Sequence, residues 1–200
     1  MVKNLLFDLG GVIMDIRREN CEQAFRQLGM DSIGDYLGDY GQKGPFAALE
    51  EGKITEQEFR DSVRALIPRD VTDEEIDKAF NRFLTGIPLR RLEELRRLRK
   101  DYKLYLLSNT NSIMWRQDIA RYFRQEGKSL EDYFDGIVTS FEAKCCKPDP
   151  AIFRLVVEKC GISPEETIFF DDSKANVEAA SQLGFGTRHV APGTEFYELL

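Results

Sequence analysis

The chain has 200 residues, 42% of them hydrophobic and 32% charged, which is enough to bury a sizeable core and argues against a minimal or disordered protein. Its 28 basic and 35 acidic residues give a net charge of −7, which argues against broad binding to nucleic acids or anionic membranes. The first apolar run breaks at Asp8, too soon for a signal peptide or a membrane span, and this predicts a cytoplasmic protein.

Short apolar runs alternate with helical patterns along most of the chain. The runs lie at 3–7, 103–108, 136–140, 167–170 and 187–190. Segments with apolar residues three and four apart lie between them at 88–101, 112–126, 150–161 and 173–184, and two of these end in glycine, as helices commonly do. This alternation predicts an α/β fold with a doubly wound parallel sheet.

The strand signal vanishes between residue 15 and about residue 86, where the pattern is helical. Thr55 and Thr72 each stand three residues before a glutamate, a capping-box signature for helices at 56–67 and 73–84. We therefore expect a helical module at 16–86, inserted into a core made of 1–15 and 87–200. Asp15, where the chain leaves the core, is expected to be a hinge or capping residue rather than a catalytic acid.

Polar residues stand at the ends of four expected strands. Asp8 ends the first, Ser108 ends the second, Lys147 follows the third after a short loop, and Asp171 and Asp172 end the fourth. Open α/β sheets place their sites at the carboxyl ends of the strands, so we expect these side chains to meet at one edge. Four polar ends at one edge indicate a reactive site more strongly than any one of them alone.

Three carboxylates at one edge would repel one another unless a cation joined them. Mg²⁺ is the expected cofactor, because it takes hard oxygen ligands and binds through one or two carboxylates and a substrate phosphate. Lys147 would neutralise the remaining charge, while the Ser108 hydroxyl and backbone amides around Leu9, Gly10 and Asn109 would hold phosphate oxygens. Asp8 would then attack phosphorus and form an aspartyl-phosphate.

The motifs FDLGGV, LLSNTN, KPDP and FFDDSKAN appear in that order, and from residue 4 to about residue 190 the chain resembles the haloacid dehalogenase-like hydrolases. It looks most like phosphatases with a small helical cap after the first motif, among them glucose-1-phosphatase-like members. The resemblance implies a site made of the nucleophile and metal ligand Asp8, the carbonyl of Gly10 on the metal, the phosphate-binding Ser108, the lysine Lys147, the metal ligand Asp172 and its supporting neighbour Asp171.

Gly10 departs from the family pattern. Family phosphatases usually carry a second aspartate there, which protonates the leaving group and later activates water, a function worth about 10²- to 10⁴-fold in rate. One explanation is a leaving group that needs little protonation, as in a sugar 1-phosphate or an acyl phosphate. A second is haloacid dehalogenation, although those enzymes need no metal and replace the acidic pair retained at 171–172. A third is a protein that binds a phosphorylated ligand and turns over poorly.

We therefore expect a Mg²⁺-dependent phosphatase of a small phosphorylated metabolite, such as a sugar 1-phosphate, acting as a monomer or weak homodimer without nucleic-acid or membrane partners. In the module, Glu50 and Phe46 are candidates to face the substrate, although Phe46 fits the module core better. Trp115 and His189 are expected to be structural. The four cysteines, including the adjacent pair at 145–146, are expected to be reduced thiols.

Overall fold

The computed structural model describes residues 1–38 and 41–200. A five-stranded parallel sheet forms the centre of the core, in the order β5-β4-β1-β6-β7. Its strands are β1 (Asn4–Phe7), β4 (Lys103–Ser108), β5 (Gly136–Thr139), β6 (Thr167–Asp171) and β7 (Gly186–His189). The predicted doubly wound α/β sheet is confirmed, because each apolar run became a strand whose ends lie within one residue of those expected.

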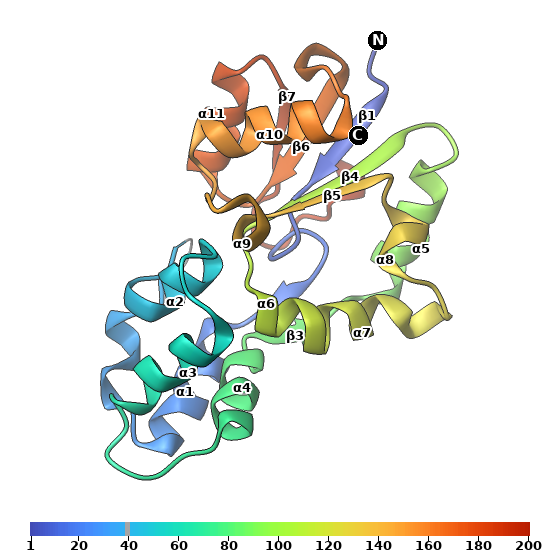
Figure 1. The fold of residues 1–200 in the computed structure, drawn as a ribbon. Helices are drawn as coiled ribbons and strands as arrows, with labels where there is room; N and C mark the ends of the chain where they lie inside the picture. The colour runs from blue at the N-terminus through green and yellow to red at the C-terminus, as the bar shows by residue number, and fades with distance from the viewer. Residues whose placement is uncertain (39–40) are drawn as a thin grey trace.

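Helices cover both faces of the sheet (Figure 1). Leu5 and Phe7 of β1 point into one hydrophobic cluster and Leu6 into the other, and all three are fully buried, as is typical of a central parallel strand. The helices around the sheet are α5 (Leu89–Leu98), α8 (Leu130–Tyr133), α9 (Ser140–Ala143), α10 (Pro150–Cys160) and α11 (Lys174–Gln182). Helices α5 and α8 pack on the Leu5 face, and α10 and α11 pack on the Leu6 face.

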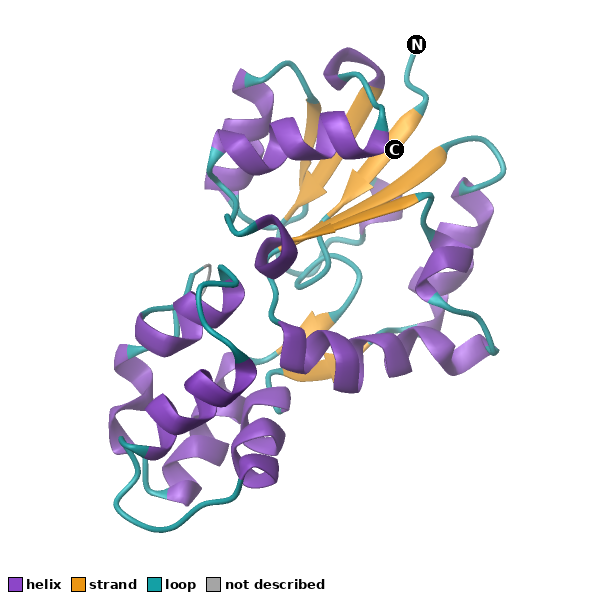
Figure 2. Cartoon of the chain, viewed as in Figure 1, coloured by secondary structure: helices purple, strands orange, loops and turns teal. Residues whose placement is uncertain are grey.

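The helical module holds α1 (Arg18–Leu28), a 3₁₀ turn (Asp31–Asp35), α2 (Gly44–Glu50), α3 (Glu56–Arg64) and α4 (Asp73–Asn81). Figure 2 shows these helices gathered beside the sheet rather than on it. The predicted capping boxes at Thr55 and Thr72 are both present. The module has its own aromatic core, in which Phe46 packs edge-on against Phe59 and Phe80 with ring centroids 5.1 Å apart.

Two short strands join the module to the core. Strands β2 (Asp15–Ile16) and β3 (Leu84–Gly86) pair antiparallel, with Asp15 opposite Gly86. The expectation of a strand-free segment is wrong here, and the helix expected at 73–84 ends at Asn81, because strands of two and three residues are too short to show a periodicity. The predicted domain boundaries fall within this ribbon, and the division into core and module remains our proposal.

The segment expected to be one helix at 112–126 changes its type of turn three times. It consists of α6 (Ser112–Met114), a π-helical turn (Trp115–Ile119), α7 (Ala120–Phe123) and a 3₁₀ turn (Arg124–Glu126). Gln117 in the π turn donates to Asp77 of α4 over 2.7 Å and accepts from Asn81 over 2.8 Å. The irregular turns thus present a side chain that ties the core to the module. No helix within 1–38 and 41–200 is long and apolar enough to cross a membrane.

Candidate active site

The carboxyl ends of β1, β4 and β6 bring the predicted polar residues together. Asp8 follows β1 directly, and its backbone N–H donates to the carbonyl of Phe170 over 2.9 Å, which continues the β1–β6 ladder. Carboxylate oxygens of Asp8, Asp171 and Asp172 all lie within 4.8 Å of one another. The edge lies beside the switch in strand order between β1 and β6, where open α/β sheets bind their ligands.

Lys147 is buried between two of these carboxylates. Its Nζ lies 2.7 Å from Asp8 Oδ1 and 2.7 Å from Asp171 Oδ2, and it also donates to the carbonyl of Leu107 over 3.0 Å. Burial acts to lower the pKa of Lys147, but the carboxylates of Asp171 and Asp8 raise it above its ordinary value. The ammonium group therefore stays charged and faces the Asp8 carboxylate.

Asn109 fixes the loop that carries Lys147. Its side-chain amide donates to the carbonyl of Lys147 over 2.9 Å and accepts from the Lys147 N–H over 2.8 Å. The side chain of Asn109 therefore positions the lysine, and phosphate binding by its backbone amide remains a prediction. Ser108, the last residue of β4, is buried at the same edge and lines the cavity described below.

Asp171 and Asp172 are adjacent in sequence but differ in environment. Asp171 is fully buried, and its carboxylate accepts from the Ser173 N–H over 2.8 Å and from the Asn176 amide over 3.0 Å. Asp172 lines the cavity instead, and the His189 ring contacts its backbone carbonyl over 2.9 Å. Asn176 was not predicted as a site residue, although it lies within the motif FFDDSKAN, in the first turn of α11.

The site raises the pKa values of two carboxyl groups. Burial raises the pKa of Asp8 to about 7; the Lys147 ammonium opposes this rise, and the carboxylates of Asp171 and Asp172 add to it. Burial and the neighbouring Asp171 raise the pKa of Asp172 to about 6. Burial is the larger cause of both shifts, and the neighbouring carboxylates add to it despite the charge of Lys147.

Gly11 lets the backbone pass close to Asp172. Its φ is +73°, and a Cβ built on it would lie 2.3 Å from Asp172 Oδ2, well inside van der Waals contact. The turn around it is tight, since the N–H groups of Ile13 and Met14 both donate to the Leu9 carbonyl, over 2.9 and 2.8 Å. The close approach of the backbone to Asp172 therefore occurs at Gly11, and Gly10 is not among the glycines with a positive φ.

A cavity of about 100 Å³ opens above these groups, between the core and the module. One water needs about 10–15 Å³ counted in the same way, so the cavity has room for a small metabolite. Its lining includes core residues Asp8, Leu9, Gly10, Met14, Ser108, Asn109, Thr110, Met114, Ile119, Lys147, Asp172 and Asn176, and residues Ile16, Gln42, Glu50, Phe80, Phe83 and Leu84 of segment 16–86.

The structure separates the other candidates. Glu50 lines the cavity, whereas Phe46 is buried in the module core and Trp115 packs against the hydrophobic core outside the lining. The Asp15 carboxylate accepts from Arg91 over 2.8 Å, as suits a hinge residue. The four cysteines are free thiols.

The residues at the cavity floor fit Mg²⁺. Three carboxylates and one ammonium group leave a formal charge of −2, and the clustered ligand atoms are oxygens, which Mg²⁺ prefers. The Asp8 and Asp172 pKa values are raised by burial and by the neighbouring acids, so a divalent cation would favour both ionised forms. Asp8 and Asp172 also face the cavity, where a metal would reach a phosphate.

Comparison with known proteins agrees with this geometry. Residues 2–184 match the haloacid dehalogenase-like hydrolase family. The chain is 39% identical over 200 residues to the D-ribitol-5-phosphate phosphatase of Bacteroides thetaiotaomicron (100% of this chain, 97% of that protein), and 32% identical over 184 residues to a phosphorylated carbohydrates phosphatase of Thermotoga maritima (90% and 81%). A B. thetaiotaomicron family enzyme crystallised with magnesium and inorganic phosphate superimposes with a TM-score of 0.94 at 40% identity, over 100% of both chains.

Proposed function

The chain belongs to the haloacid dehalogenase-like hydrolases and is a Mg²⁺-dependent phosphatase of that family, and from this premise we propose that it hydrolyses phosphomonoesters of small sugars or polyols. Two relatives that span most of the chain are named for substrates of this class. The observation that carries the proposal is the position of the Asp8 carboxylate, 2.7 Å from the Lys147 ammonium at the floor of a cavity with room for a small metabolite. Two further carboxylates lie close enough to Asp8 to share one cation with it.

In the proposed reaction Asp8 is the nucleophile. One carboxylate oxygen of Asp8 forms a bond to phosphorus, the bond from phosphorus to the leaving oxygen breaks, and an aspartyl-phosphate results. Water then attacks phosphorus and returns the carboxylate. When bound, Mg²⁺ neutralises the charge on the phosphate and the carboxylates, which makes attack of one anion on another feasible.

The other residues hold the phosphoryl group and the metal. We assign Asp8, Asp172 and the carbonyl of Gly10 to the metal, with Asp171 holding Lys147 and supporting the metal site. Lys147 contacts the transferring phosphoryl group as its charge develops. The Ser108 hydroxyl and the backbone amides of Leu9, Gly10 and Asn109 bind phosphate oxygens.

Within this class, sugar 1-phosphates remain candidate substrates, because their hemiacetal oxygen leaves with little help. Sugar and polyol phosphates esterified at an ordinary alcohol are the other candidates, and D-ribitol 5-phosphate is the member suggested by the relative. The predicted cytoplasmic location and the monomer or weak homodimer remain predictions.

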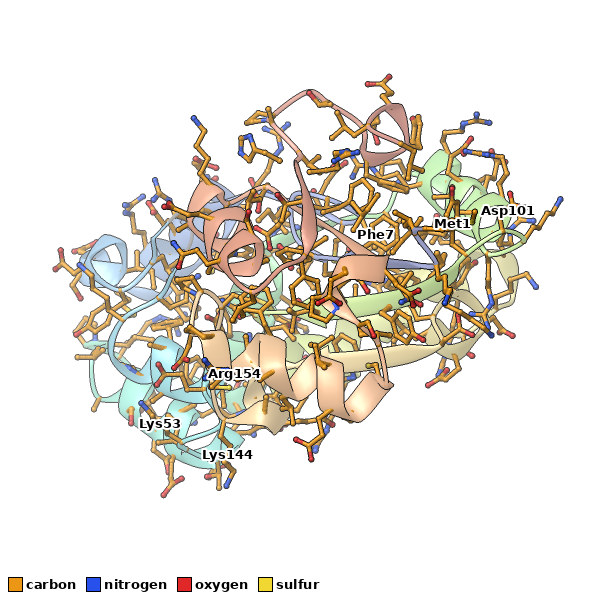
Figure 3. All side chains as sticks on the ribbon, turned by 90° about the horizontal axis from the view of Figure 1, so that it is seen from above. Met1, Phe7, Lys53, Asp101, Lys144 and Arg154 are labelled. Atoms are coloured by element: carbon orange, nitrogen blue, oxygen red, sulfur yellow. The ribbon has the colours of Figure 1, made fainter. Side chains whose placement is uncertain are left out.

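A panel assay of phosphate release tests the proposal. It should contain sugar 1-phosphates, D-ribitol 5-phosphate, an acyl phosphate and p-nitrophenyl phosphate, each with Mg²⁺ and with EDTA. We expect Mg²⁺-dependent release from sugar or polyol phosphates, abolished in Asp8→Asn because an amide cannot form the intermediate. Asp101→Asn, an exposed change at the far end of the core (Figure 3), is the matched control and should behave as wild type.

The same panel addresses the two alternatives. A protein that binds phosphate esters and releases none would be the poorly active ligand-binding protein considered from the sequence. Chloride release from a 2-haloacid without Mg²⁺ would indicate a dehalogenase, although the retained pair Asp171 and Asp172 argues against that chemistry. Full activity in Asp8→Asn would remove Asp8 from the nucleophile's role.

A further inference from the structure

One carboxyl group in the cavity has no part in the reaction described so far. Glu50 is the last residue of α2 in the helical module, and it lines the same cavity as Asp8, Lys147 and Asp172. Of the described residues in this lining, these four carry titratable side chains. Three of them are assigned to the phosphoryl group and the metal, which leaves Glu50 as the titratable group of this lining without an assigned role.

Contacts with the core fix the position of Glu50. Gly52 has a φ of +61°, and a Cβ built on it would lie 2.0 Å from the carbonyl oxygen of Phe141 in α9, so a larger residue would prevent this approach. The Cys146 thiol donates to the Glu50 carbonyl over 3.9 Å. In Figure 3, Lys53 after this turn and Lys144 of the core lie at the same end of the molecule. Glu50 therefore sits next to the loop that carries Lys147.

The Glu50 carboxyl has the properties of a proton donor. It makes no hydrogen bond or ion pair within residues 1–38 and 41–200, whereas the neighbouring Glu51 pairs with Lys53 over 2.5 Å. Burial raises the pKa of Glu50 to about 8, and the Glu51 charge adds to this rise. A carboxyl group with this pKa carries its proton at neutral pH, as general acids in enzymes do.

The proposed substrates create a need for such a donor. An ordinary sugar or polyol alcohol is a poor leaving group unless its oxygen receives a proton. Gly10 has no side chain to supply one. Two other titratable groups near the site are occupied, because the Asp15 carboxylate is bound to Arg91 and the His189 ring contacts the Asp172 carbonyl.

We propose that Glu50 protonates the leaving oxygen, an inference that rests on the proposed function. In the first step the bond between Asp8 and phosphorus forms, the bond from phosphorus to the leaving oxygen breaks, and the freed electron pair takes the Glu50 proton to give the alcohol. In the second step water bonds to phosphorus, and the bond from Asp8 to phosphorus returns its electron pair to the Asp8 carboxylate. The proton of that water goes to the Glu50 carboxylate, and the enzyme is restored.

The test compares two leaving groups in Glu50→Gln. We would measure kcat/KM for D-ribitol 5-phosphate and for p-nitrophenyl phosphate, whose nitrophenolate leaves without a proton. This parameter covers the steps up to release of the leaving group. For the polyol phosphate we expect a loss of about 10²- to 10⁴-fold, and for the nitrophenyl ester a loss below about tenfold. Glu51→Gln is the matched control, because Glu51 is adjacent but outside the cavity lining, and it should lose little on either substrate.

The outcomes separate the inference from the proposed function. Equal losses on both substrates in Glu50→Gln, with circular dichroism and melting unchanged, would make Glu50 a structural or binding residue and overturn the inference alone. No loss on either substrate would overturn it as well. Wild-type protein that hydrolyses neither substrate would overturn the proposed function, and the inference with it.

Discussion

Replacing Gly11 by alanine should weaken Mg²⁺ binding in addition to destabilising the fold. The added methyl group would lie 2.3 Å from Asp172 Oδ2 and 2.8 Å from its Cγ, whereas ordinary contacts of this kind begin at 3.4 Å. The Asp172 carboxylate must therefore move by roughly 1 Å to restore van der Waals contact. A shift of this size at a metal ligand should lower the Mg²⁺ affinity about 10- to 100-fold, by analogy with disturbed metal sites.

The backbone contributes a second effect, which a control variant isolates. Alanine at a φ of +73° costs about 1–2 kcal/mol of folding stability. Gly127 has a φ of +70°, and a Cβ built on it meets nothing within 4 Å, so Gly127→Ala carries the backbone cost without the contact. The difference between the two variants therefore reports the displacement of Asp172.

Calorimetric titration with Mg²⁺ and urea unfolding in EDTA would measure both effects. We expect similar losses of stability in the two variants, with weakened Mg²⁺ binding and activity in Gly11→Ala alone. If Gly11→Ala bound Mg²⁺ as tightly as Gly127→Ala, the reasoning that Asp172 holds the metal from this position would be refuted.

Three further predictions concern charge. In wild type, kcat/KM for D-ribitol 5-phosphate should fall above pH about 8 as Glu50 deprotonates, and Glu50→Gln should lack this fall. A fall that persists in Glu50→Gln assigns it to another acid, such as Lys147 across the cavity, because Asp8 and Asp172 act in their ionised forms. Glu51 pairs with Lys53, and burial raises the pKa of the Cys146 thiol to about 12. Because the folded pKa of Glu50 lies above its ordinary value of 4.5, its stabilising effect is complete below pH 4.5 and is lost as the pH rises to about 8. Glu50→Gln should therefore be more stable than wild type at pH 9 relative to pH 4, by about 1–3 kcal/mol in urea unfolding after allowance for solvent screening; an equal pH dependence would contradict this. Lys147→Met should lower the free energy of unfolding in EDTA by about 3–5 kcal/mol, because it leaves buried carboxylates unpaired. Lys103→Met, at an exposed ion pair, should lower it by less than about 1 kcal/mol. Equal losses in the two variants would contradict the pairing of Lys147 with buried carboxylates.

Much of the core and of the cavity floor was predictable, because local patterns determine them. Each central strand is a short apolar run, and parallel strands place their carboxyl ends at one edge, so Asp8, Ser108 and Asp171 had to lie near one another.

The remainder depends on contacts between segments distant in sequence. Strands β2 and β3 are too short to carry a periodicity, and the π turn at Trp115–Ile119 has no distinct sequence pattern. Phe46 and Glu50, four residues apart, were both candidates to face the substrate, although the pattern favoured Phe46 for the module core. Only the packing of the module buries Phe46 among other aromatic rings and places Glu50 in the cavity.

The most direct test of the reaction is to trap the phosphorylated enzyme. Wild-type protein would be mixed with Mg²⁺ and D-ribitol 5-phosphate carrying a labelled phosphoryl group, quenched in acid within a single turnover, and digested for mass spectrometry. We expect the label as an acyl phosphate on the Asp8 carboxylate, and no label in Asp8→Asn. Phosphate released at the wild-type rate with no label on Asp8, or with the label on another residue, would contradict the proposed mechanism.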